Sequence, residues 1–234
     1  MTQTPNQAPA HDSASGTARP TKGERTRQRI LQTALEIFAE YGYAGVSLRE
    51  VAARAGITHA GLLHYFAGKD DLLLTMMIER DRAEVDAIRH FVADTAAAEG
   101  GPQSVDEVII RWLIRDIARN QRRPDIAPLF VKLSAEATDS RHPAHDYFRN
   151  RYATLRASLA RGFAHAFATA DPPITGRDPD ICAQQLIALA DGLQVQWLLD
   201  RNSTDMVASL LDYLRCLGIE PSGWADIDVP DDQR

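Results

Sequence analysis

Long apolar runs are missing from the sequence, and cysteine is scarce. No stretch of about 18 consecutive apolar residues occurs, so a membrane-spanning helix is not expected. The N-terminal residues contain no apolar segment behind a basic start, so a secretory signal is not expected either. The two cysteines, Cys182 and Cys216, are too few for a disulfide framework and fit a reducing cytoplasm, where we expect both to fill apolar space.

Positive charge is also in deficit. The 234 residues carry 26 basic and 32 acidic side chains, a formal net charge of −6. Taken alone, this value argues against a nucleic-acid partner, because phosphates attract basic surfaces. The charge is uneven, however. Residues 19–69 hold eight basic and four acidic side chains, a balance of +4, whereas the other residues hold 18 and 28, a balance of −10.

The residues that are present are ordinary globular material. Hydrophobic residues make up 44% and charged residues 25% of the chain, which is enough to bury a core. Apolar residues recur at helical spacing through most of the chain, and we find no period-2 run bounded by turn residues. The sequence therefore predicts an all-α fold of about nine helices. The longer ones are expected near residues 70–98, 104–120, 124–138, 143–170, 179–200 and 204–217.

A short segment near the N-terminus has the pattern of a helix-turn-helix. Capping boxes with Ser or Thr three residues before Glu begin helices at Thr21 and Ser47, and Thr58 can cap a third helix. Gly42 ends the first helix, and Gly56 supplies the freedom that a tight turn needs. The last of these helices would present polar and aromatic side chains outward, as a helix in a DNA major groove does.

The residues of this segment resemble a known family. The matching positions are Ile30, Ala34, Phe38, Gly42-Tyr43, Val46 to Ala52, Ala55-Gly56-Ile57, Leu62, His64-Tyr65-Phe66 and Lys69 to Leu73. In this order and spacing, residues from about 24 to 80 are similar to the DNA-binding domain of the TetR family of transcriptional regulators. The resemblance implies a homodimeric repressor whose C-terminal domain binds a small ligand and thereby releases DNA.

The resemblance also implies roles for individual residues. Arg49 matches a position that reaches a base edge or a phosphate, and arginine suits bidentate contact with guanine. One departure is Leu63, where many family members have tyrosine; it is expected to touch a thymine methyl or to pack. The DNA-binding residues implied by the resemblance are Ser47, Arg49, Thr58, His59, Gly61, Leu63, His64, Tyr65 and Lys69. Without the resemblance, His59 and His64 could be plain surface residues, and Arg49 could pair with Glu50 or Glu36.

The acidic body is predicted to be a helical bundle for ligand binding and dimerisation. Its aromatic stripes are compatible with core packing, and four of their members are candidates for lining a ligand pocket: Trp112, Phe130, Tyr152 and Phe163. The last two helices are apolar on more than one face, so each needs two partners. One of these can be a second subunit, as is typical of the family, although burial within one subunit is the alternative. The candidate dimer residues are Leu186, Leu189, Leu193, Trp197, Leu210 and Leu214.

Signals of an enzyme or a metal site are poor. The sequence contains neither a phosphate-cradling glycine loop nor a Gly-x-Ser-x-Gly motif, so we expect no catalytic residues and no cofactor. Asp139, His142, His145 and Asp146 could be imagined as metal ligands, but Asp and His are common at a helix start. Two other hypotheses stay open. The chain could be a helical ligand-binding or scaffold protein without DNA affinity, or a small-molecule enzyme with its site in the bundle.

The domain boundaries follow from these patterns. We expect a tail over residues 1–22, a helix-turn-helix domain over 23–83 with its motif near 46–65, and a ligand-binding and dimerisation domain over 84–218. An acidic tail is expected over 219–234. The predicted partners are double-stranded DNA, an unknown small-molecule effector and a second copy of the chain, in the cytoplasm and without a membrane.

Overall fold

The computed structural model describes residues 21–99, 104–121 and 127–221. Within these ranges the structure contains nine helices and no strand, which confirms the predicted all-α fold. The helices are α1 (Lys22–Tyr41), α2 (Leu48–Arg54), α3 (His59–Leu63), α4 (Lys69–Glu99), α5 (Val105–Gln121), α6 (Ala127–Glu136), α7 (His145–Thr169), α8 (Pro179–Leu199) and α9 (Met206–Cys216). None of the helices described is both long and apolar enough to cross a membrane.

Local sequence signals set the ends of the first helices. Thr21 accepts a hydrogen bond from the Glu24 N–H, and the Glu24 carboxylate accepts from the Thr21 N–H, so this capping box is complete. Gly42 ends α1 with φ 72°, and Gly56 forms the turn after α2 with φ 65°. Both angles lie in the region that favours glycine. Gly42 therefore ends the first helix and Gly56 forms the turn of the motif, as the sequence predicted.

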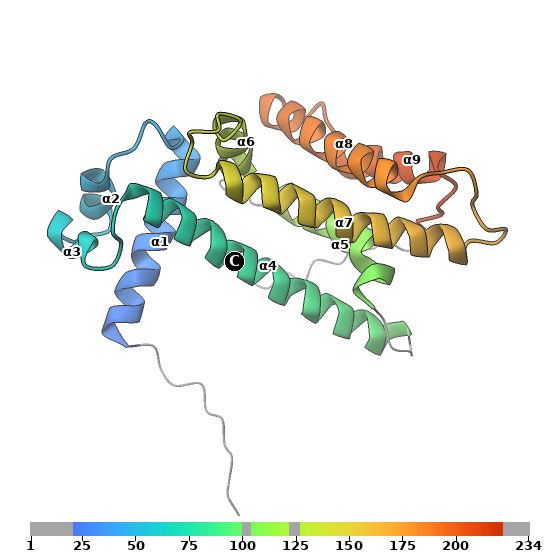
Figure 1. Cartoon of the computed structure of the whole chain (residues 1–234), viewed down its shortest axis with the longest axis horizontal. Helices are drawn as coiled ribbons and strands as arrows, with labels where there is room; N and C mark the ends of the chain where they lie inside the picture. The colour runs from blue at the N-terminus through green and yellow to red at the C-terminus, as the bar shows by residue number, and fades with distance from the viewer. Residues whose placement is uncertain (1–20, 100–103, 122–126, 222–234) are drawn as a thin grey trace, which may run out of the picture.

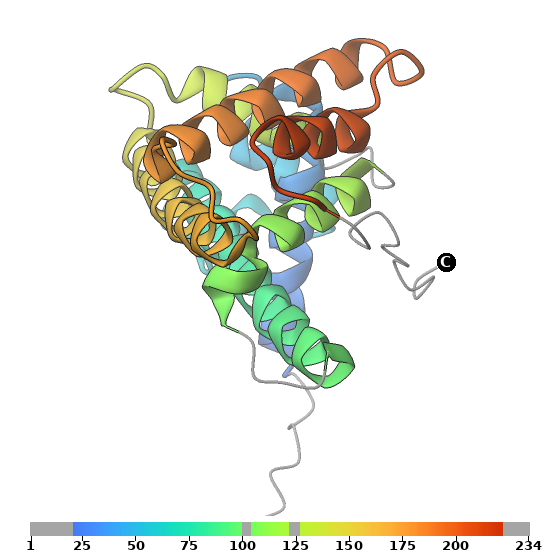
Figure 2. The same ribbon diagram turned by 90° about the vertical axis from the view of Figure 1, so that its right-hand side faces the viewer.

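The nine helices form a head and a body (Figure 1). The head consists of α1, α2, α3 and the first turns of α4, and the body contains α5 to α9 with the rest of α4. The long helix α4 leaves the head and continues beneath α7, with α8 and α9 on the opposite side of α7. Figure 2 shows the body end-on, with α5 between α4 and α9. A single helix thus connects both parts of the chain.

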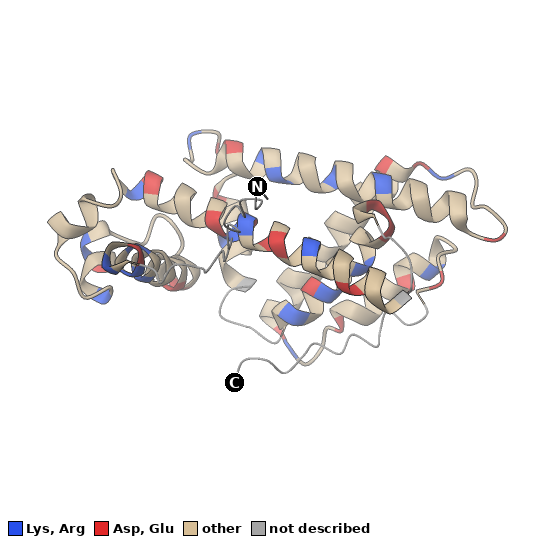
Figure 3. Ribbon diagram, turned by 90° about the horizontal axis from the view of Figure 1, so that it is seen from below, with Lys and Arg blue, Asp and Glu red and all other residues tan. Residues whose placement is uncertain are grey.

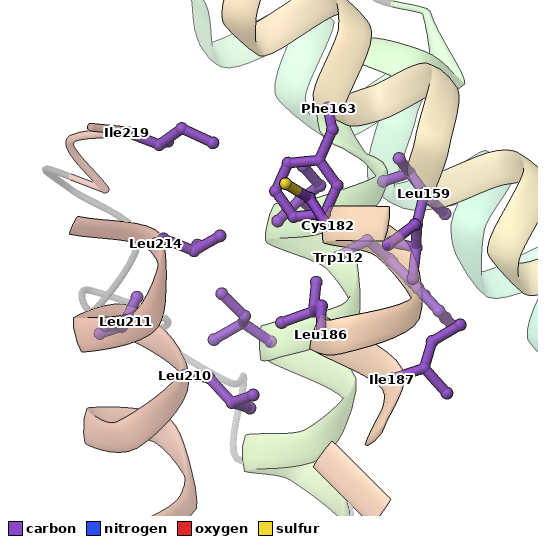
Figure 4. Close-up of a cluster of buried hydrophobic side chains, with 14 of the residues drawn as sticks. Trp112, Leu159, Phe163, Cys182, Leu186, Ile187, Leu210, Leu211, Leu214 and Ile219 are labelled. Carbon is purple, nitrogen blue, oxygen red and sulfur yellow. The ribbon is translucent and has the colours of Figure 1, made fainter. Parts of the chain in front are cut away.

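Buried apolar side chains form two clusters. The body cluster joins α5, α7, α8 and α9, and Figure 4 shows Trp112, Phe163 and Leu186 meeting in it. The head cluster contains Phe38, Phe66 and the start of α4, but it also includes Leu129 and Leu133 from α6. Helix α6 therefore packs its apolar side against the head, although it lies in the sequence of the body.

Several predicted boundaries differ from the structure. Helix α6 ends at Glu136 instead of residue 138, and α7 begins at His145 instead of residue 143; the expected start at residue 124 lies outside the described residues. Residues 137–144 form turns between the two helices, and one of them places Ala144 in the head core. Ile219 is buried against the body although the acidic tail was expected to start there. Residues 1–20 and 222–234, where most of the two expected tails fall, lie outside the described residues.

Candidate nucleic-acid interface and ligand cavity

The helix-turn-helix is built by two capped helices. The Ser47 hydroxyl accepts from the Glu50 N–H at 3.3 Å, and the Thr58 hydroxyl accepts from the Gly61 N–H at 3.0 Å. Only half of the capping box expected at Ser47 forms, because the Glu50 carboxylate instead lies 3.9 Å from Arg54. Each cap satisfies one otherwise unpaired donor at a helix start. The caps therefore define where α2 and α3 begin.

The candidate DNA-binding residues lie on α2, on α3, beside these two helices and at the start of α4, and their exposure varies. Glu50 lies toward Arg54 and Glu36 accepts from Gln32, so neither carboxylate holds Arg49. Buried Leu62 anchors α3 in the head core. The exposed candidates are Ser47, Arg49, Thr58, Leu63 and His64, and the half-buried ones are His59, Gly61, Tyr65 and Lys69.

The basic side chains of the head fall into two groups. Arg27 pairs with Glu79 at 3.1 Å and Arg54 pairs with Glu40 at 3.3 Å, so these two cations connect helices. Figure 3 shows the charged positions of the head and body from below. Arg54 is itself exposed, and the other exposed cations of the described head residues are Lys22, Arg25, Arg29 and Arg49. Arg25 and Arg29 are one helical turn apart, a spacing that the motif comparison did not single out.

Lys69 occupies the start of α4 and contacts the head internally. Its Nζ lies 4.1 Å from the centroid of the Tyr43 ring. Desolvation lowers the pKa of Lys69, against the opposing charges of Asp70 and Glu136. The Tyr43 hydroxyl donates to Asp70, and desolvation raises the Tyr43 pKa. Lys69 is thus placed beside a tyrosine that also contacts the body.

Helix α6 holds the C-terminal end of α1. Lys132 donates to the carbonyls of Ala39 at 2.8 Å and Glu40 at 2.7 Å. Helix ends leave such carbonyls without intrahelical partners, so a lysine there acts as a cap. Glu136 accepts from the Tyr43 N–H at 3.0 Å. We call this group of contacts the α1–α6 joint.

A cavity of about 680 Å³ opens among α4, α5, α6, α7 and α8. This is the usual size of a small-molecule site. Of the four predicted pocket residues, Phe130 and Tyr152 line the cavity. Trp112 and Phe163 lie instead in the body core, with exposed fractions of 3% and 0%.

Charged side chains also line the cavity. Arg151 on α7 pairs with Glu84 at 2.8 Å and with Asp81, both on α4. Asp116 pairs with Arg119 and accepts from Asn120 at 2.7 Å, and desolvation raises the Asp116 pKa. Desolvation also raises the pKa of Tyr152 to about 12.

Most of the candidate dimer residues lie inside a single chain. Leu189 is partly buried against the body core. The others are buried within it: Leu186, Leu193, Trp197, Leu210 and Leu214. The large apolar side chains of α8 that stay exposed are Ile181, Val195 and Leu199, of which Val195 borders the cavity. This surface of α8 was missed because a broad apolar helix does not show which of its faces the chain's own core covers.

The residues considered as metal ligands have protein partners. Asp139 pairs with Arg141 at 2.7 Å, and His145 Nδ1 lies 2.8 Å from the Ala137 carbonyl. Within the described ranges, no group of three or more His, Cys, Asp or Glu residues is arranged to hold a metal ion. Cys182 is buried, as predicted, but Cys216 is exposed, so the prediction that both fill apolar space is wrong for Cys216.

Comparison with known proteins gives two family matches. Residues 30–76 match a family model described as bacterial regulatory proteins, tetR family. Residues 109–217 match a model described as BetI-type transcriptional repressor, C-terminal. The chain is 27% identical over 205 residues to the HTH-type transcriptional regulator AcrR of Shigella flexneri, an alignment that covers 86% of this chain and 92% of AcrR.

Two solved structures have a similar fold. FadR from Bacillus subtilis in complex with stearoyl-CoA superposes with a TM-score of 0.60 at 17% identity, over 81% of this chain and 96% of FadR. A regulator from Saccharomonospora viridis in complex with choline gives 0.57 at 22% identity, over 82% and 96%. Both likenesses concern the head and body together, because they extend over most of each chain.

Proposed function

The chain belongs to the TetR family of bacterial regulatory proteins, and we propose that it is a homodimeric repressor that binds a palindromic operator and is released by a small-molecule effector. It acts in the cytoplasm, where the operator is. The observation that carries this proposal is the capped helix α3, which the head core anchors through Leu62 while Leu63 and the two cap residues, Thr58 and His64, stay exposed.

Specific DNA contact is assigned to the start of α3 and to α2. Thr58, His59 and Gly61 form the first turn of α3, which enters the major groove. Arg49 reads a base edge or contacts a phosphate. Ser47, His64, Tyr65 and Lys69 position the head on the backbone, and Leu63 contacts a thymine methyl or packs. The exposed cations of α1 add sequence-independent affinity.

The dimer surface is assigned to the outer face of α8. Residues 181–199 contain a single charged side chain, Asp191, whereas the exposed surface of a monomer is ordinarily rich in charge. Ile181 and Leu199, with 47% and 84% of their surface exposed, lie at opposite ends of this helix. A twofold dimer through this face would present two α3 helices to two half-sites, which requires a palindromic operator.

Release by the effector is assigned to the body cavity. Similar folds hold stearoyl-CoA and choline in the two complexes described above. Phe130 of α6 lines the cavity, and α6 also forms the α1–α6 joint. A ligand that fits the cavity better in one position of α6 would shift the head, to the extent that its affinity differs between the two states.

Substitution of Arg49 tests the DNA contact. We expect Arg49→Ala to weaken binding to the upstream DNA of its own gene by about 1–3 kcal/mol and to relax sequence preference. Lys69→Ala should weaken binding to all sequences alike, because a phosphate contact carries no sequence information. Fluorescence anisotropy with the upstream duplex and a scrambled duplex measures both effects across a salt series.

Arg149→Ala, on the body surface at α7, is the matched control for loss of an arginine. It should leave the affinity unchanged. If the wild-type chain protects no palindrome at low salt, the proposal of DNA binding fails. If Lys69→Ala changes the sequence preference, the division between base and phosphate contacts is wrong.

Substitution of Ala188 tests the dimer surface. Ala188 is exposed near the middle of α8, so the monomer should tolerate a long charged side chain there. We expect Ala188→Arg to convert a dimer at micromolar concentration into a monomer, because it places two unpaired charges at the centre of the interface. Sedimentation velocity measures the change. Ala97→Arg, at an exposed position of α4, should remain dimeric; an Ala188→Arg dimer would overturn this surface.

A further inference from the structure

One arginine of the body cavity lacks the partners that the others have. Arg119 pairs with Asp116, and Arg151 pairs with Glu84 and Asp81. Arg80, on α4, lines the same cavity. Its Nε is buried without a hydrogen-bond partner, and no ion pair to its guanidinium is found among the residues that the structure describes.

Arg80 lies against an aromatic ring that it shares with a second arginine. Its guanidinium lies 4.7 Å from the centroid of the Phe130 ring, and Arg151 lies 5.2 Å from the same centroid. Contact with a ring face leaves the N–H donors at the edge of the guanidinium unused. Desolvation lowers the pKa of Arg80; the charges of Asp116 and Glu84 oppose that shift, and the charge of Arg151 adds to it.

A carboxylate of the cavity provides the contrast. Asp191, on α8, accepts a hydrogen bond from the Tyr152 hydroxyl at 2.8 Å, and desolvation raises its pKa. An aspartate can therefore relieve the loss of water by taking up a proton. Arginine stays charged under all ordinary conditions. Arg80 is thus the arginine of this cavity for which the described residues provide no ion pair, although the charges of Asp116 and Glu84 favour its cation.

The rest of the lining is largely apolar. Leu113 and Ile117 come from α5, Leu155 from α7 and Ile187 from α8. An apolar ligand body would displace water from these side chains, which favours binding. A carboxylate group on the ligand would supply the ion-pair partner for Arg80, because its two oxygens match the fork of N–H groups on one arginine.

We propose that the cavity binds an apolar carboxylate whose carboxylate group pairs with Arg80 and whose apolar body lies against α5, α7 and α8. This proposal names the chemical class of the effector and rests on the proposed function. The aromatic ring of Phe130 connects the bound anion to α6, since Arg80 already stacks on that ring. Binding at Arg80 would therefore act on the helix that forms the α1–α6 joint.

Direct binding of matched probes to the full-length chain tests the proposal. The carboxylates are decanoate and 1-naphthoate, and their uncharged counterparts are decanol and 1-naphthalenemethanol. Decyltrimethylammonium supplies the opposite charge on the same chain length. Isothermal titration calorimetry at pH 7.5 without DNA is expected to give at least tenfold tighter binding for one or both carboxylates than for their uncharged counterparts.

Variants assign that preference to a residue. Arg80→Gln should lower carboxylate affinity at least tenfold and leave the uncharged probes unchanged, and Arg80→Lys should restore part of the loss, because it returns the charge without the fork. Asp191→Asn removes the negative charge of a second polar lining residue and keeps its size. It should leave carboxylate binding unchanged or make it tighter. Circular dichroism and the thermal midpoint show whether each variant is folded.

Three results would overturn the carboxylate site. The first is equal affinity for carboxylates and uncharged probes, and the second is no binding of either carboxylate at 1 mM. The third is tighter binding of the ammonium probe than of the carboxylates, with this preference lost in the Asp191→Asn variant. Failure of the proposed function looks different. Carboxylate binding through Arg80 without any effect on DNA affinity would remove release by the effector but leave the site in place. DNA binding without carboxylate binding would overturn the carboxylate site but leave the proposed DNA-binding function in place.

Discussion

Replacement of Arg151 by methionine is expected to lower the free energy of unfolding by about 3 kcal/mol at pH 7.5. Arg151 connects α7 to α4 through Asp81 and through Glu84 at 2.8 Å. The Tyr147 hydroxyl donates to the same Asp81 at 2.9 Å. All three ionised side chains are less than one-third exposed. Removal of the cation leaves two desolvated carboxylates close together, and this accounts for the loss.

The loss should depend on pH in a defined direction. Desolvation already raises the pKa of Asp81 above its ordinary value of 3.8, and loss of Arg151 would raise it further. A carboxyl whose pKa is raised on folding destabilises the folded state as pH rises through the interval between the unfolded and folded values. The Arg151→Met loss should therefore be smallest near pH 4 and grow until the raised pKa is passed.

Urea unfolding at fixed protein concentration measures this loss at pH 4.5 and pH 7.5. The matched control is the triple variant Arg151→Met, Asp81→Asn and Glu84→Gln, which removes all three charges. It should recover more than half of the stability lost at pH 7.5. Equal losses at both pH values, or no recovery in the triple variant, would mean that Arg151 acts through packing on Phe130 instead, whose ring centroid is 5.2 Å from its guanidinium.

Much of the fold follows from local signals in the sequence. The Thr21 capping box and Gly42 bound α1, and Thr58 begins α3, because these residues act on backbone groups within a few positions. The same locality explains why the helix-turn-helix residues are mostly exposed: they follow the period of a helix whose other face is buried. Contacts between distant elements have no such signal.

The body illustrates what the sequence leaves undecided. The apolar faces of α8 predict two partners, but not which residue meets which partner. The core that α8 shares with α5, α7 and α9 of the same chain buries Leu186, Leu193 and Trp197. The outer face of α8 is left to contact another surface. Likewise, the charged residues of α4 resemble those of a solvent-exposed helix. Arg80 nevertheless lines a cavity, because α5, α6 and α7 enclose its turn of α4.

The α1–α6 joint also could not be predicted from the sequence. Lys132 and Glu136 are one turn apart on α6, a common pattern on solvated helices. Instead, Lys132 contacts the last turn of α1 and Glu136 contacts Tyr43 just after it, more than 90 positions earlier in the chain. Their partners are backbone groups, which carry no residue-specific pattern. The joint could only be found once the position of α6 against the head was known.

Replacement of Gly42 at this joint is expected to lower the free energy of unfolding by about 3 kcal/mol. Gly42 has φ 72° and ψ 179°, a combination that is almost confined to glycine. A Cβ at this position would also lie 2.3 Å from Glu136 Oε1. Glu136 would have to move, and its hydrogen bond from the Tyr43 N–H at 3.0 Å would be lost. Gly42→Ala thus combines backbone strain with the loss of a contact between head and body.

A double-mutant cycle with Glu136→Ala separates these two causes. The single variant Glu136→Ala should cost about 1 kcal/mol, because the Tyr43 N–H loses its acceptor. In that background Gly42→Ala should cost only about 1–2 kcal/mol, the strain of the backbone alone, because no carboxylate remains to be displaced. Urea unfolding of the four chains gives the coupling between the two positions.

Gly176→Ala is the matched control for strain without a neighbour. Gly176 has φ 73°, and a Cβ there would meet nothing within 4 Å, so its cost should be the same with and without Glu136. Additive effects of Gly42→Ala and Glu136→Ala would contradict the contact between α1 and α6. A coupling of 1 kcal/mol or more would establish that α6 acts on the end of α1, the connection through which a ligand in the body cavity would move the DNA-binding head.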